Sequence, residues 1–180
     1  TVNMIDTSVD GGTSWSASDN GIVDDRREVS AIAISPSDSD RVYAAVPSQQ
    51  GPRVYGSSDG GSNWSDLSAT LGGTSTIERI VIDPTDPDVV YLINAANQIQ
   101  KSTDGGANWG DVITGLAGSH GNDIAIDPTA PATLFAAGTG VYRTTNGGGN
   151  WVSVNNGDLD SSYVIETVAV NPHDAQQVLA

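Results

Sequence analysis

The stretch Ser57-Ser58-Asp59-Gly60-Gly61-Ser62-Asn63-Trp64 decides the fold, because three close copies of it occur elsewhere in the chain. We call these four segments boxes; the other three span residues 8–15, 102–109 and 144–151. The last position of every box holds one of the four tryptophans of the protein, Trp15, Trp64, Trp109 and Trp151. Self-similarity with a period of about 45 residues indicates a repeat architecture.

A second segment recurs between the boxes, with alternating apolar residues that end at a proline. Its copies are residues 32–36, 80–84, 124–128 and 168–172. Proline removes a donor from a strand ladder, and the Asp- and Ser-rich residues that follow favour turns. A constant seven residues separate each proline from a later apolar residue, which indicates a turn of fixed length; these apolar residues are Tyr43, Tyr91, Phe135 and Leu179.

Each repeat therefore holds four strand-like segments: strand A ends at the proline, strand B contains the Tyr43-type residue, strand C precedes the box and strand D follows it. Four short strands per repeat, with no helical periodicity, predict an all-β propeller with four-stranded antiparallel blades. We expect one domain over 1–180, with three whole blades between two half blades. The expected units are 1–23 (half), 24–68, 69–113 and 114–156 (whole), and 157–180 (half).

The boxes, together with the Ile-x-Ile-Asp-Pro segments, resemble the Asp-box (bacterial neuraminidase repeat) β-propeller superfamily over essentially the whole chain. That superfamily includes sortilin-type receptors and xyloglucan hydrolases, so the resemblance implies the fold and leaves the function open. In the superfamily the box is a structural hairpin. The resemblance thus implies structural roles for Asp10, Trp15, Asp59, Trp64, Asp104, Trp109, Asn146 and Trp151.

The chemistry of the box residues agrees with a structural role. A carboxylate accepts N–H groups of its own turn, glycine adopts positive φ, and tryptophan buries apolar area against the blade. Asn146 replaces the aspartate in the fourth box, and its amide oxygen preserves the turn bonds but not a metal or catalytic carboxylate. Calcium takes roughly six to eight oxygen ligands, and each blade has one box, so we expect no metal and no cofactor.

Composition excludes several classes of function. The net charge of −15 disfavours nucleic acid, and no apolar stretch approaches the ~18 residues of a membrane span. Without cysteine there is no disulfide or thiolate chemistry. The abundance of aspartate fits a secreted or a salt-adapted protein, and we expect a secreted, extracellular or cell-surface location. Because Thr1 opens the chain and Ala180 falls within a strand, we expect further sequence on both sides.

Because strand direction alternates within a blade, the A–B turns and the boxes should share one face. The B–C and D–A loops should share the opposite face, and they differ between repeats; we call it the variable-loop face. Binding residues are commonly carried on such loops, so we expect a glycan or protein ligand there. The candidate ligand-binding residues are Arg26, Arg27, Gln49, Gln50, His120, Asn122, Asp158, Asp160 and Tyr163.

Glu78 and Glu166 are the candidate catalytic residues, because they occupy equivalent positions before strand A of two blades. Glycoside hydrolysis needs two carboxyl groups about 5 to 9.5 Å apart, and one blade intervenes between these two. The sequence matches neither the arginine motif of sialidases nor the catalytic motifs of xyloglucan hydrolases. We therefore expect an extracellular binding or scaffold module without self-sufficient catalysis. The alternatives are part of a secreted glycoside hydrolase acting on polysaccharide, and a self-assembling unit that associates through its half-blade edges.

Overall fold

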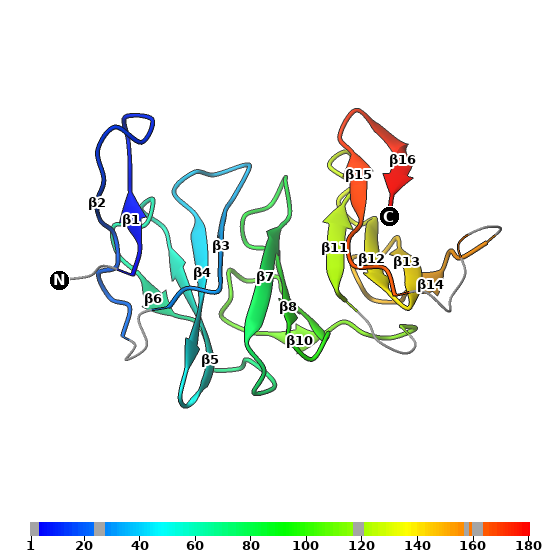
Figure 1. The fold of residues 1–180 in the computed structure, drawn as a ribbon, viewed down its shortest axis with the longest axis horizontal. Helices are drawn as coiled ribbons and strands as arrows, with labels where there is room; N and C mark the ends of the chain where they lie inside the picture. Colours follow the sequence, from blue (N-terminus) through cyan, green and yellow to red (C-terminus); the bar gives the residue numbers. More distant parts are fainter. Residues whose placement is uncertain (1–3, 24–27, 117–120, 157–158, 160–163) are drawn as a thin grey trace.

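The computed structural model describes residues 4–23, 28–116, 121–156, 159 and 164–180. Within these residues the chain forms sixteen β-strands and no helix, arranged as a row of five antiparallel sheets (Figure 1). Three sheets have four strands, and the sheets at the two ends of the row have two. The predicted fold class, with three whole blades and two half blades, is confirmed.

The strands follow the chain from one end of the row to the other. The first half blade contains β1 (Asp6–Thr7) and β2 (Ser16–Ala17). Blade I contains β3 (Ala31–Ile34), β4 (Val42–Ser48), β5 (Gly51–Ser57) and β6 (Ser65–Asp66). Blade II contains β7 (Ile77–Ile82), β8 (Val90–Asn94), β9 (Ile99–Ser102) and β10 (Gly110–Asp111). Blade III contains β11 (Asp123–Ile126), β12 (Leu134–Gly138), β13 (Gly140–Thr144) and β14 (Val152–Ser153), and the last half blade contains β15 (Ala169–Asn171) and β16 (Asp174–Leu179).

The A and B strands keep one register in every repeat, which explains the constant spacing after the proline. Each apolar residue of strand B pairs with the residue three positions before the proline, in the pairs Ala33↔Tyr43, Val81↔Tyr91, Ala125↔Phe135 and Ala169↔Leu179. The last hairpin differs beyond this pair. A register shift between Val170 and Asn171 lets Asn171 pair with Asp174, so its turn is tighter.

The boxes and the A–B turns lie on one face, as predicted. In each whole blade the first box glycine donates its N–H to a carbonyl of the A–B turn of the same blade. The pairs are Gly60 with Asp40 (3.0 Å), Gly105 with Asp88 (3.0 Å) and Gly147 with Ala132 (2.8 Å). Because strands alternate in direction, the B–C and D–A loops lie at the opposite end of each blade.

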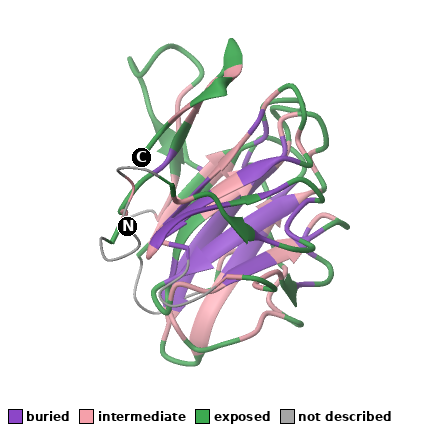
Figure 2. Cartoon of the chain, turned by 90° about the vertical axis from the view of Figure 1, so that its right-hand side faces the viewer, coloured by how far each residue is buried: buried purple, intermediate pink, exposed green. Residues whose placement is uncertain are grey.

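The core lies between neighbouring blades, so the central strands are buried on both sides (Figure 2). On β8, Val90 and Leu92 pack in the cluster shared with blade I, whereas Tyr91 and Ile93 pack in the cluster shared with blade III. Alternating side chains point to opposite faces of a strand, and here both faces meet a neighbour. A central strand is consequently apolar at successive positions.

The box tryptophans pack against the preceding blade. Three of them are 2–8% exposed, and their indole Nε1 groups donate across the interface: Trp64 to Ser18 O (2.6 Å), Trp109 to Leu67 O (2.9 Å) and Trp151 to Val112 O (2.7 Å). Trp15 is 66% exposed, and its Nε1 donates to Gly12 O of its own box. The expectation that every box tryptophan is buried is wrong at Trp15, because no sheet of the described residues precedes the first half blade.

Candidate functional site

The carboxylate oxygens of the box aspartates accept hydrogen bonds from groups of their own turn. In the second box, Asp59 Oδ1 accepts the N–H of Asn63 (2.8 Å) and the Ser57 hydroxyl (2.8 Å), while Oδ2 accepts Asn63 Nδ2 (2.7 Å). In the fourth box, Asn146 Oδ1 accepts the N–H of Asn150 at 2.9 Å and the Thr144 hydroxyl at 2.8 Å. One oxygen therefore maintains the turn, and the second charged oxygen is dispensable.

These hydrogen bonds favour the ionised carboxylate. They lower the pKa of Asp10 to about 2, mainly through the Ser14 hydroxyl and then through the Ser14 N–H and the Ser8 hydroxyl. The pKa values of Asp59 and Asp104 are lowered in the same way, first by the side-chain amides that follow them. Because the folded-state pKa lies below the unfolded value, the boxes stabilise the fold above about pH 4. This contribution is lost as the pH falls through the folded-state pKa.

The Asp10 carboxyl is expected to titrate near pH 2, and Ser14→Ala is expected to raise its pKa towards the ordinary value of 3.8. The substitution removes the hydroxyl that donates to Asp10 Oδ2 at 2.6 Å. Carboxyl ¹³C chemical shifts followed by NMR between pH 1 and 6 measure both values. Ser16→Ala, just beyond the box, is the control and should leave the titration unchanged. A wild-type Asp10 that titrates near 3.8 would contradict the role of these bonds.

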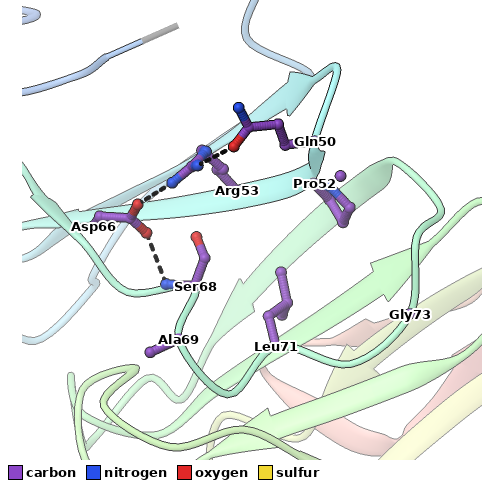
Figure 3. Close-up of a pocket in the computed structure, with 9 residues that line it drawn as sticks. Gln50, Pro52, Arg53, Asp66, Ser68, Ala69, Leu71 and Gly73 are labelled. Carbon is purple, nitrogen blue, oxygen red and sulfur yellow. Dashed lines mark hydrogen bonds and ion pairs between the residues drawn. The ribbon is translucent and has the colours of Figure 1, made fainter.

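A polar pocket of about 330 Å³ opens on the variable-loop face (Figure 3). It lies between the B–C turn of blade I and the segment that leads from β6 to blade II. Arg53 forms an ion pair with Asp66 at its rim, and Arg53 Nη2 also donates to Gln50 Oε1 at 3.4 Å. Burial raises the pKa of Asp66, but the hydrogen bonds from Ser68 and the Arg53 charge outweigh it and lower the pKa. The pocket therefore presents fixed charges above the apolar side chain of Leu71.

Of the residues expected to bind a ligand, Gln50 lines this pocket, and Gln49 lies exposed in the same turn. Asn122 lies directly before β11 and uses Nδ2 to donate to Ile165 O at 3.0 Å, so its amide joins two chain segments. The remaining six candidates lie outside the described residues: Arg26, Arg27, His120, Asp158, Asp160 and Tyr163.

Arg53 and Asp66 are not among the predicted binding residues because both lie in strands, and the predicted site is confined to the loops. Strand register was the available signal. Tyr55 pairs with Asp66, so Arg53 lies two residues along the same face of β5 and within reach of the carboxylate.

Glu78 and Glu166 are both exposed and lie on the two sides of β11. Arg79, which follows Glu78, and Thr167, which follows Glu166, both contact Asp123. Asp123 is only 2% exposed. Asp123 Oδ1 lies 3.2 Å from Arg79 Nε, and its Oδ2 accepts the Thr167 hydroxyl at 2.6 Å. This link between three consecutive repeats fixes the edge that carries the two glutamates, and no pattern in the sequence predicts it.

Among the residues that the structure describes, no three His, Asp or Glu side chains are grouped so that they could hold a metal ion. The same part of the chain contains no helix with the length and apolar character needed to cross a membrane.

No family model and no curated protein matches the sequence. Solved structures do match it. An ancestral GH74 enzyme aligns with a TM-score of 0.70 and 21% identity over 93% of this chain and 23% of its own. The GH74 xyloglucanase from Xanthomonas campestris has a TM-score of 0.59 and 22% identity over 81% of this chain and 26% of its own. YCF48 bound to D1 peptide has a TM-score of 0.58 and 16% identity over 91% of this chain and 50% of its own.

These likenesses show a shared β-propeller fold. The chain spans about a quarter of the two GH74 structures and half of the YCF48 structure.

Proposed function

We propose that this chain is part of a non-catalytic binding propeller that holds a protein segment of net positive charge on its variable-loop face. The observation that carries the proposal is the fixed edge on which Glu78 and Glu166 expose their carboxylates, on a chain with a net charge of −15. The buried Asp123, through its contacts with Arg79 and Thr167, holds this edge together. An acidic surface attracts and orients a cationic partner, and it repels anionic ones.

The rigidity of this edge supports binding. Asp123 joins Arg79 of β7 to Thr167, so the segments that carry Glu78 and Glu166 are held relative to each other before any ligand arrives. A preorganised surface loses little conformational freedom when a partner binds. The two exposed carboxylates then offer separated anchor points for Lys or Arg side chains of an extended segment.

The likeness to YCF48, whose structure is bound to D1 peptide, supports a protein ligand. We also propose that the chain is a member of the Asp-box superfamily, on the basis of its four boxes. The aspartate-rich composition supports an extracellular location.

A Lys- and Arg-rich peptide is expected to bind the chain. The double variant Glu78→Gln/Glu166→Gln is expected to weaken binding about 2- to 30-fold, because each exposed ion pair contributes about 0.2 to 1 kcal/mol. Fluorescence anisotropy of a labelled peptide measures the affinity, which should fall as salt is raised.

The matched control is Asp38→Asn/Asp40→Asn, which removes the same two charges from the box face. Its affinity should stay within about twofold of the wild type, because the charges it removes are distant and screened. Equal loss in both double variants would contradict a site on the variable-loop face and would indicate attraction by net charge alone.

A hydrolase propeller is the second candidate, favoured by the TM-score of 0.70 with the ancestral GH74 enzyme. It requires the two glutamates to act as acid and base or nucleophile on one glycosidic bond. Release of reducing sugar from xyloglucan, abolished by either Glu78→Gln or Glu166→Gln, would replace the binding proposal with this one.

A further inference from the structure

The B–C hairpin of blade I is longer than its counterparts, and it forms one wall of the polar pocket on the variable-loop face (Figure 3). Strands β4 and β5 each have seven residues, whereas β8, β9, β12 and β13 have four or five. Ser48 holds the turn, because its hydroxyl donates to Gly51 O at 2.7 Å and accepts the Gln50 N–H at 3.2 Å. Pro47 and Pro52 face each other across the hairpin, and proline restricts the backbone. The wall is therefore fixed before a ligand arrives.

The ion pair of Arg53 and Asp66 lies at the rim of this pocket with both charges held in place. The Ser68 N–H donates to Asp66 Oδ1 at 2.9 Å, and Gln50 Oε1 accepts from Arg53 Nη2. A guanidinium has several N–H donors and a carboxylate accepts several hydrogen bonds, so both groups keep capacity for a ligand. The two side chains are 32% and 39% exposed, which leaves this capacity accessible. The rim therefore offers donors beside acceptors with no net charge.

The interface between blades I and II departs from the repeat beside this pocket. At the preceding interface the Tyr55 hydroxyl donates to Val23 O at 2.9 Å and accepts the Val23 N–H at 3.3 Å. Gln100 holds the position of Tyr55 in the next repeat, and Gly72 holds the position of Val23. The Gln100 amide donates instead to Asp111 Oδ1 of its own blade at 3.0 Å. The segment around Gly72 thus lacks the two bonds that a tyrosine would give it.

The same exchange leaves a buried acceptor without a donor. Gln100 is 5% exposed, and its Oε1 accepts no hydrogen bond from any residue that the structure describes. A Cβ atom at Gly72 would lie 2.6 Å from Gln100 Nε2, so these two residues are adjacent. Leu71 and Gly73, on either side of Gly72, both line the pocket. The pocket therefore lies where the repeat gives up a tyrosine contact.

The chemistry of the pocket fits a neutral ligand with several hydroxyl groups. A charged group would have to displace one member of the ion pair, whereas a hydroxyl both donates and accepts without breaking it. Two neighbouring hydroxyls on one ring match a donor that lies beside an acceptor, and Pro52 and Leu71 offer apolar contacts for the C–H groups of that ring. The volume of about 330 Å³ is at the lower end of the roughly 300 to 1,000 Å³ typical of small-molecule sites. It suits a single sugar ring.

We propose that this pocket is a binding site for one neutral sugar ring, in which one hydroxyl accepts a hydrogen bond from Arg53 and its neighbour donates to Asp66. The site goes beyond the peptide-binding function proposed above, because neither Glu78 nor Glu166 lines it. Since the pocket recognises hydroxyl groups of a neutral ligand, its affinity should not change with salt, in contrast to that of a cationic peptide.

NMR titration of the ¹⁵N-labelled 180-residue chain with the methyl glycosides of glucose, galactose, mannose and xylose tests the proposal. At least one of the four is expected to shift the amide signals of Gly51, Arg53 and Gly73. The dissociation constant should be about 1 mM, the range expected for so small a ligand.

A pair of matched variants tests the role of the ion pair. Asp66→Asn keeps the shape of the side chain and removes its charge, and it is expected to weaken sugar binding about tenfold or more. Asp88→Asn is the control, because Asp88 forms a similar ion pair with Arg41 on the box face. Its sugar affinity should stay within about twofold of the wild type, since it leaves every hydrogen bond to the sugar in place.

Deoxy analogues of the bound glycoside test the contacts without changing the protein. Removal of either hydroxyl that contacts the ion pair should weaken binding about tenfold or more, because a polar group of the site is then left unpaired. The double variant Glu78→Gln/Glu166→Gln is expected to bind the sugar as the wild type does, so failure of the peptide proposal and failure of this one are distinguishable.

Three results would each overturn the sugar site. The first is that none of the four glycosides shifts the three amide signals at ten times the expected dissociation constant. The second is equal weakening by Asp66→Asn and Asp88→Asn, or binding that no deoxy analogue weakens. The third is displacement of the sugar by the Lys- and Arg-rich peptide, which would assign the pocket to the peptide instead.

Discussion

Replacing Trp151 by alanine is expected to lower the free energy of unfolding by about 3 to 5 kcal/mol, the usual cost of truncating a buried aromatic residue. Trp151 is 2% exposed and lies in the core that joins blades II and III, together with Tyr91 and Ile99. Its indole also donates to Val112 O at 2.7 Å, so truncation leaves a cavity and removes the donor from that carbonyl.

The same substitution at Trp15 provides the control. Trp15 is 66% exposed, so Trp15→Ala should change the free energy of unfolding by less than about 0.5 kcal/mol, since exposed positions rarely contribute more. Urea denaturation followed by circular dichroism measures both variants. An equal loss at the two positions would mean that the indole stabilises its own box, and the contact with the preceding blade would then be unimportant.

Much of the fold could be predicted because short-range spacing within each repeat determines its hairpins. The proline and the apolar residue seven positions later fix the A–B hairpin, and the structure pairs Tyr43, Tyr91, Phe135 and Leu179 in one register. The blade that covers a box tryptophan cannot be predicted from such short-range spacing. It depends on the order of the sheets, so the sequence alone did not separate Trp15 from the other three.

The candidate site was less predictable for the same reason. Variable loops pointed to the correct turn at Gln50, which lines the pocket. The ion pair of Arg53 and Asp66 depends on strand register, and the bonds of Asp123 to Arg79 and Thr167 join three repeats. The contacts of Asp123 join separate repeats and leave no trace in the spacing of residues along the chain, whereas the register of one hairpin was an available signal for Arg53 and Asp66.

Gly115→Ala is expected to lower the free energy of unfolding by about 3 kcal/mol or more, the sum of backbone strain and a steric clash. Gly115 has φ of +91°, where residues with a Cβ atom are strained. A Cβ atom here would also lie 2.2 Å from Trp151 O, a backbone atom that cannot turn aside as a side chain can. Relief requires blades II and III to separate at the position where the N–H of Trp151 donates to Thr114 O.

Gly11→Ala separates strain from clash, because Gly11 has φ of +70° and no atom within 4 Å of the added Cβ. Its cost should be only the strain, about 1 to 2 kcal/mol. Thr70 occupies the position of Gly115 at the preceding interface, where its hydroxyl accepts the N–H of Trp109 at 2.8 Å in place of a carbonyl. The glycine is therefore required where a backbone carbonyl accepts the tryptophan N–H, as it does at this interface and also at the first one beside Gly21. Equal losses for Gly115→Ala and Gly11→Ala in urea denaturation would contradict that requirement.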